Sequence, residues 1–182
     1  MSRIILVTGG ARSGKSSFAQ SVFEKESDVV YIATYRMYDD DLEMKERITL
    51  HKKSRPSKWK TFEGSYGLDE AVHGYKNYIL DCLTVMTSNI MFDISKDAEI
   101  ISQDMQNQIE RKVFNEIKKL IDEVINIDGN LVVVTNEVGC SIVPENHVAR
   151  VYRDIMGRIN QRIAKMCDEA FIMSCGIPLK IK

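Results

Sequence analysis

An octet near the N-terminus has the residue types and spacing of a phosphate-binding loop. It matches the pattern G-x-x-x-x-G-K-[ST], follows a short apolar run and precedes a helical pattern that begins at Ser17. Its residues are Gly9, Gly10, Ala11, Arg12, Ser13, Gly14, Lys15 and Ser16. Glycines let the backbone turn its N–H groups toward phosphate oxygens, and the start of a helix adds positive potential. Rather than an empty glycine-rich turn, we expect a purine nucleoside triphosphate here, with Lys15 at the outer phosphates and the Ser16 hydroxyl on Mg²⁺.

A metal-bound triphosphate also needs an acid at the end of a neighbouring strand. Asp81 follows the apolar pair Ile79-Leu80 and is the residue that we expect on the metal side. The alternative is an aspartate that only terminates its strand in a turn.

His51 is the one histidine of three that lies among cations along the chain, between Arg47 and Arg55 and beside Lys52 and Lys53. A neutral imidazole is a competent nucleophile toward an α-phosphate, and neighbouring cations would stabilise the charge on phosphorus. From the residues alone, a surface histidine in a charged helix is the better interpretation.

A second polar constellation falls on one face of a helix that Pro144-Glu145 opens. Its members are Arg150, Arg153, Asp154, Gly157, Asn160 and Gln161. Gly157 costs about 1 kcal/mol relative to alanine inside a helix, and an ordinary solvated face would use Glu and Lys. A contact with a substrate or another subunit is therefore as good an interpretation as simple exposure.

The elements that must position these residues alternate along the chain. Short, nearly continuous apolar runs predict strands at 4–7, 29–32, 78–80, 131–135, 171–173 and 179–181. Helical stretches separate most of them, and the longest predicted helix spans about 100–127. This pattern indicates an α/β fold with a doubly wound, mostly parallel sheet of the P-loop NTPase type.

Length and composition fit one such domain over residues 1–182, with an irregular segment at 35–66. A net charge of -1 provides no basic field for nucleic acid. We expect no membrane span and a cytoplasmic location, because no run approaches about 18 apolar residues and no signal peptide is evident. The four cysteines lack metal-ligand spacing, so we expect them to be small buried residues.

The chain closely resembles one family over its whole length. The resemblance rests on ILVTGGARSGKS, on YIAT at 31–34, on RP-x-x-W ending at Trp59, on VTNEVG at 134–139, on IVPEN at 142–146, on R-x-x-RD-x-x-G-x-x-NQ and on the closing SCGIPLKIK. These motifs are similar to those of the bifunctional adenosylcobinamide kinase and adenosylcobinamide-phosphate guanylyltransferase of cobalamin biosynthesis.

The resemblance implies two reactions on a corrinoid substrate. ATP or GTP phosphorylates adenosylcobinamide, and GMP from GTP then passes to adenosylcobinamide phosphate through a GMP-histidine intermediate. His51 occupies the matching position, which reverses the interpretation from the residues alone. The resemblance also implies a homotrimer. The further residues that it places around the nucleotide are Ala33, Thr34, Tyr35, Lys52, Lys53, Ser54, Arg55, Glu63 and Asp81.

The sequence departs from the family pattern at a few positions. Leu50 stands where the family carries a histidine before the nucleophile, Asp81 replaces a glutamate, and Pro178-Leu179 replaces a small pair. A plain P-loop small-molecule kinase, without a covalent nucleotide, is the alternative. A nucleotide-dependent switch is disfavoured because the segment 135–138 lacks the lysine and aspartate of a guanine-reading N/T-K-x-D element.

Overall fold

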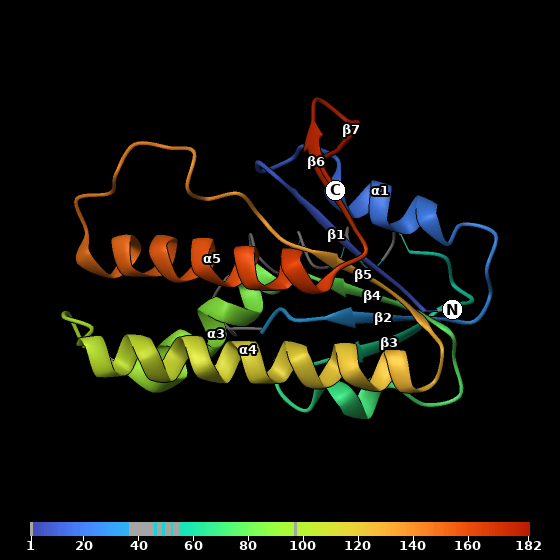
Figure 1. The fold of residues 1–182 in the computed structure, drawn as a ribbon, viewed down its shortest axis with the longest axis horizontal. Helices are drawn as coiled ribbons and strands as arrows, with labels where there is room; N and C mark the ends of the chain where they lie inside the picture. Colours follow the sequence, from blue (N-terminus) through green and yellow to red (C-terminus); the bar gives the residue numbers. More distant parts are fainter. Residues whose placement is uncertain (1, 37–45, 47–48, 50–51, 53–54, 97) are drawn as a thin grey trace.

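A seven-stranded sheet forms the centre of the fold (Figure 1). The computed structural model describes residues 2–36, 46, 49, 52, 55–96 and 98–182. The strands are β1 Arg3–Gly9, β2 Val29–Ala33, β3 Lys60–Glu63, β4 Asn77–Asp81, β5 Asn130–Val134, β6 Glu169–Ser174 and β7 Ile177–Lys180. Their order is β3-β2-β4-β5-β1-β6-β7, and only the β6–β7 pair is antiparallel. The predicted, mostly parallel sheet is confirmed.

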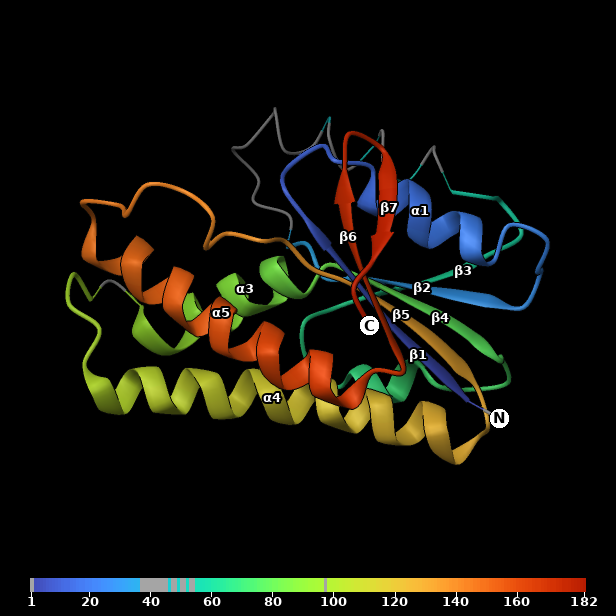
Figure 2. The ribbon, with the colours of Figure 1, turned by 45° about the horizontal axis from the view of Figure 1, so that its top comes forward.

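Helices cover both faces of this sheet. They are α1 Lys15–Val22, the 3₁₀ helix η1 Leu68–Ala71, α3 Leu83–Ser95, α4 Gln103–Asn126 and α5 His147–Met166. Helix α1 lies on one side, and α3, α4 and α5 lie on the other (Figure 2). The doubly wound architecture expected from the sequence is therefore confirmed. No described helix is long and apolar enough to cross a membrane.

Side chains that alternate along the strands divide the core into two clusters. Ile4 and Leu6 of β1 pack on the side of α3, α4 and α5, whereas Ile5 and Val7 pack on the side of α1. Successive side chains of a strand point to opposite faces, so an apolar residue is needed at every position. This explains why the inner strands are continuous apolar runs rather than alternating ones.

Two expectations need correction. Strand β3 was not predicted within the segment 35–66, because three of its four residues are exposed and it forms one edge of the sheet. Cys140 and Cys175 are exposed rather than buried, whereas Cys167 is buried and Cys82 is half-buried. The predicted helices at 100–127 and after Pro144 are confirmed, and Asn146 caps α5 through the backbone N–H of Ala149.

Candidate functional site

The octet predicted to bind phosphate connects the end of β1 to the start of α1. Gly9 has a φ of 145°, and a Cβ there would lie 2.5 Å from the Met173 carbonyl oxygen. Gly14 caps α1 with a φ of 96°, and a Cβ there would lie 3.2 Å from the Gly176 Cα. Both positions therefore require glycine, and the turn packs closely against the tip of the β6–β7 hairpin.

Lys15 reaches back across the turn. Its ammonium donates a hydrogen bond to the Gly10 carbonyl oxygen, although the residue is only 8% exposed. Burial lowers the pKa of Lys15, and the nearby Cys82 and Asp81 oppose that shift. A partly desolvated cation beside backbone N–H groups is suited to an anionic ligand, because phosphate oxygens would replace the weak carbonyl partner.

A second feature of the turn fits a phosphate ligand. The buried Ser13 hydroxyl has no hydrogen-bond partner among the described residues, although its backbone carbonyl accepts a bond of 3.0 Å from the Gly176 N–H. Buried polar groups are normally paired, so an unpaired one calls for a ligand or water. The Ser16 hydroxyl and the Asp81 carboxylate supply the hard oxygen donors that Mg²⁺ prefers.

Asp81 ends β4, two strands from β1 in the sheet. Its carboxylate accepts a hydrogen bond from the hydroxyl of Tyr31 on β2. Burial, followed by Asp81, raises the pKa of Tyr31, so the phenol stays protonated and donates. The Arg55 guanidinium stacks 3.8 Å from the centre of the Tyr31 ring, and its buried Nε and Nη1 lack partners among the described residues. Arg55 is therefore a cation held close to Asp81 and available to an anion.

A cluster of three residues lies beyond Arg55. Glu63 accepts a hydrogen bond of 2.6 Å from the Tyr35 hydroxyl and forms an ion pair of 2.7 Å with Lys52. Lys52 and Tyr35 together lower the pKa of Glu63. These contacts bring together three residues that the family resemblance placed around the nucleotide.

The remaining predicted residues divide into two groups. Ala33 and Thr34 are completely buried, and the Thr34 hydroxyl donates to the Cys82 carbonyl oxygen over 2.7 Å. Their side chains are therefore part of the core beneath the carboxyl ends of β2 and β4 and are not exposed to a ligand. His51, Lys53 and Ser54 lie outside the described residues.

The polar face of α5 mainly supports its own chain. Arg153 donates a bond of 3.0 Å to the Gly139 carbonyl, and Arg150 donates one of 3.0 Å to the Pro144 carbonyl. Asn160 accepts a bond of 2.8 Å from the Thr135 hydroxyl. Asp154 and Gln161 are exposed, and a Cβ at Gly157 would meet no described atom within 4 Å. The sequence suggested either a contact with a substrate or subunit or simple exposure. Instead, Arg150 and Arg153 of this face hold the loop between β5 and α5.

Comparisons with known proteins identify the family of this chain. A family model described as cobinamide kinase / cobinamide phosphate guanyltransferase matches residues 5–181. The chain belongs to this family. The bifunctional adenosylcobalamin biosynthesis protein CobU of Escherichia coli is 43% identical, over 98% of this chain and 99% of the relative. CobU of Salmonella typhimurium is 42% identical over the same shares, and CobP of Pseudomonas aeruginosa is 32% identical over 97% and 96%.

Two further residues, Tyr31 and Glu137, are candidates for the site that the sequence did not single out. Tyr31 lies inside a buried strand and reads there as a core residue, yet it holds Asp81. Glu137 follows β5, and its backbone N–H donates to the carbonyl of Gly9 over 3.1 Å. Two local signals could have found them: each lies in a motif that the family resemblance rests on, and each lies at or near the carboxyl end of a parallel strand, where ligands of such sheets bind.

Proposed function

We propose that this chain phosphorylates the hydroxyl of adenosylcobinamide with ATP or GTP, then transfers GMP from GTP to the new phosphate to give adenosylcobinamide-GDP. The observation that carries the proposal is the phosphate-binding turn, with Lys15 folded over it, in a chain that matches the family model from residue 5 to 181. The names of the curated relatives support two activities rather than the plain kinase.

In this proposal the turn at 9–16 binds the β- and γ-phosphates through its backbone N–H groups and Lys15. Ser16 and Asp81 would hold Mg²⁺, which neutralises phosphate charge when it is bound. Tyr31 keeps the Asp81 carboxylate at the end of β4. Arg55 places a further cation on the same side of the sheet, and Lys52 does so beside Glu63. These contacts would position the triphosphate for either reaction.

The two reactions break different bonds of the triphosphate. In the first, the acceptor hydroxyl oxygen attacks the γ-phosphorus, and the nucleoside diphosphate leaves. In the second, we propose that a His51 nitrogen attacks the α-phosphorus of GTP and pyrophosphate leaves. The acceptor phosphate then attacks the same phosphorus and breaks the P–N bond. The role of His51 rests on the family resemblance.

We further propose a homotrimer in a reducing, cytoplasmic compartment. Ile177, Leu179 and Ile181 of the C-terminal hairpin are 68, 62 and 60% exposed, and such a patch is typical of a contact between proteins. All four cysteines are free, which is consistent with a reducing compartment. Light scattering on the purified protein would test the trimer, and a monomer across the micromolar range would contradict it.

The deciding experiment is incubation with Mg²⁺ and GTP labelled at the α-phosphate, followed by denaturing electrophoresis. We expect a covalent label that is labile in acid and stable in alkali, as a phosphoramidate is. His51→Ala should lose this label, whereas His73→Ala, which alters an exposed histidine after η1, should keep it. An enzyme that phosphorylates cobinamide but never takes up the label would be a plain kinase.

A further inference from the structure

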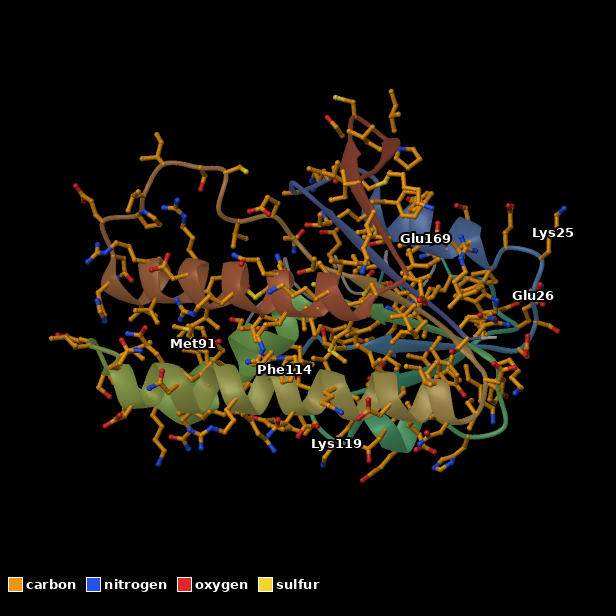
Figure 3. The ribbon with its side chains drawn as sticks, viewed as in Figure 1. Lys25, Glu26, Met91, Phe114, Lys119 and Glu169 are labelled. Atoms are coloured by element: carbon orange, nitrogen blue, oxygen red, sulfur yellow. The ribbon has the colours of Figure 1, made fainter. Side chains whose placement is uncertain are left out.

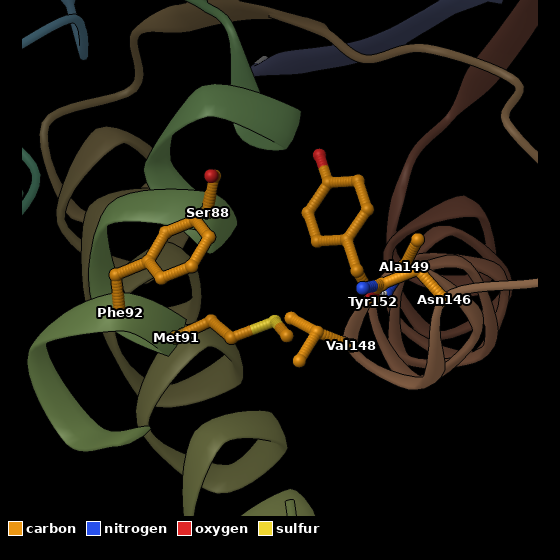
Figure 4. A pocket seen from close by; sticks show the side chains of 7 residues that line it. All are labelled: Ser88, Met91, Phe92, Asn146, Val148, Ala149 and Tyr152. Atoms are coloured by element: carbon orange, nitrogen blue, oxygen red, sulfur yellow. Dashed lines mark hydrogen bonds between the residues drawn. The ribbon is translucent and has the colours of Figure 1, made fainter. Parts of the chain in front are cut away.

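A groove lies between α3 and α5 and is formed by two adjoining hollows. The larger is about 690 Å³ and the smaller about 260 Å³, and both are lined by Ser88, Phe92 and Tyr152. In the smaller one, Ser88, Met91 and Phe92 of α3 face Val148 and Tyr152 of α5 (Figure 4). The groove therefore has room for a molecule larger than a single phosphate or sugar.

The larger hollow opens onto the phosphate-binding turn. Ala11 of the turn lines it, and so do Asn136 and Glu137 from the end of β5. The Glu137 backbone N–H donates to the Gly9 carbonyl, so this wall of the groove is attached to the turn. A ligand in the groove would consequently have one end beside the outer phosphates of the nucleotide.

Hydrogen bonds hold the floor of the groove. The Asn136 side chain donates to the Thr84 hydroxyl over 2.6 Å, and the Asn160 side chain donates to the Asn136 carbonyl over 3.2 Å. The Tyr152 hydroxyl donates to the Thr84 carbonyl over 2.9 Å and ties α5 to α3. Because both helices and the segment that follows β5 share this network, the groove is preformed rather than opened by a ligand.

The walls of the larger hollow combine apolar side chains with the amides of Asn89 and Asn136 and with the charged groups of Arg36 and Glu137. Phe92 is 51% exposed and Val85 is 37% exposed, and both line the larger hollow with Asn89 and Asn136. Exposed apolar side chains beside amide and charged groups in a concave surface suit an amphipathic ligand that has an apolar framework and polar arms. The acceptor of the proposed reactions, a corrin ring with amide substituents, belongs to this chemical class.

We infer that this groove binds the corrinoid acceptor, with its reactive arm pointing to the phosphate-binding turn, and that Glu137 accepts the proton of the acceptor hydroxyl. The inference rests on the proposed function and deepens it. The Glu137 carboxylate is fixed by a bond of 2.8 Å from the Gly139 N–H. Arg153 in turn donates to the Gly139 carbonyl, so α5 holds the segment that carries this carboxylate.

Glu137 would serve only the first of the two reactions. The hydroxyl oxygen bonds to the γ-phosphorus while the bond from that phosphorus to the departing nucleoside diphosphate breaks, and the hydroxyl proton passes to the carboxylate of Glu137 and then to water. In the second reaction the attacking oxygen belongs to a phosphate that has already lost its proton. The same groove is therefore used twice, but the base is used once.

Glu137→Gln tests the base. We expect phosphorylation of cobinamide to fall by roughly 100-fold or more, the usual contribution of a general base. GMP transfer from GTP to chemically prepared cobinamide phosphate should remain within a few-fold of the wild type, because no proton has to be removed. Equal losses in both reactions, or no loss in either, would overturn the assignment of the base.

Ser88→Trp and Phe92→Glu test the groove, since both residues line both hollows, and the first adds a bulky ring there and the second adds a charge. Both variants should lose phosphorylation and GMP transfer to the corrinoid, yet keep the covalent label from GTP, which needs no acceptor. The matched control is Ile125→Glu. Ile125 is 47% exposed on the last turn of α4, at the opposite end of the sheet from the phosphate-binding turn. Circular dichroism would verify that all three variants fold.

The outcomes separate the inference from the proposed function. If both folded groove variants carry out the corrinoid reactions at the wild-type rate, the inference is overturned. The proposed function would still stand in that case, provided that the wild type takes up the label. If the groove variants lose the covalent label together with the corrinoid reactions, the nucleoside rather than the corrinoid would lie in the groove. This result would also overturn the inference. A wild type that never takes up the label contradicts the guanylyl step itself, whatever the groove variants do.

Discussion

The Tyr31 hydroxyl on β2 donates a hydrogen bond to the Asp81 carboxylate at the end of the neighbouring strand β4. Tyr31 is paired with Ile79 in the sheet register, so Asp81 lies two residues further along on the same face. A long side chain bridges this diagonal. The metal-side acid that the sequence predicted is thus held in place by a residue from a different strand.

Tyr31→Phe should lower the free energy of unfolding by about 1.5–3 kcal/mol, the usual worth of a hydrogen bond to a charged group. The ring that stacks with Arg55 would remain. Tyr78→Phe is the matched control, because Tyr78 is as fully buried in the same sheet and donates to the neutral Tyr75 carbonyl. Tyr78→Phe should lower the free energy of unfolding by only about 1 kcal/mol. Urea unfolding would measure both, and an equal loss would contradict the special contribution of Asp81.

Lys15→Met should impair both reactions without lowering the stability of the free protein. Loss of the cation is expected to reduce both reactions by roughly 100-fold or more, as removal of one stabilising donor does elsewhere. The free protein should be as stable as the wild type or more stable. Burial lowers the Lys15 pKa, so the charged lysine opposes folding below that pKa, and the cost disappears as pH rises through its ordinary value of 10.5. A lower melting temperature at pH 7 would contradict this account.

Glu169, labelled in Figure 3, is the first residue of β6. It connects β1 to β7 through ion pairs with one residue of each strand. It pairs with Arg3 at 2.5 Å and with Lys180 at 2.8 Å, and these hydrogen bonds lower its pKa from 4.5 to about 2. The stabilisation is therefore fully present above about pH 4.5 and lost as the pH falls through about 2. Both cations are about half exposed, so we expect only about 1 kcal/mol.

Glu169→Gln should thus be less stable than the wild type at pH 7, and the difference should disappear as the pH falls below about 2. Unfolding in urea at several pH values would measure the difference, and 1 M salt should reduce it because salt screens exposed pairs. A difference that does not change with pH would show that packing, rather than charge, is responsible.

Asn160→Ala should loosen the end of β5. The Thr135 hydroxyl and the Asn136 carbonyl would each lose a partner in a largely buried setting, which costs about 1–3 kcal/mol. Gln161→Ala, at the exposed neighbour, should change stability by no more than about 0.5 kcal/mol. Thermal unfolding would compare the two variants, and equal melting temperatures would contradict the predicted contribution of the two Asn160 hydrogen bonds.

Local patterns in the sequence were enough to predict much of the fold. The octet at 9–16 could be recognised because its glycines and lysine act within one turn, and the inner strands could be recognised because both of their faces are buried. Strand β3 could not, since it is short, mostly exposed and stabilised by its neighbour β2. The family, too, could be recognised from short motifs, because each is a continuous stretch of the sequence.

Contacts between distant residues required the tertiary structure. Tyr31 and Asp81 are 50 residues apart, and they meet because β2 and β4 are adjacent although β3 lies between them in the chain. Asn160 supports Asn136, and Glu137 lies beside Gly9, because β5 is placed between β4 and β1. The sequence determined which residues can bind phosphate and form strands. Strand order, which depends on the packing of the whole sheet, decided which of them share a site.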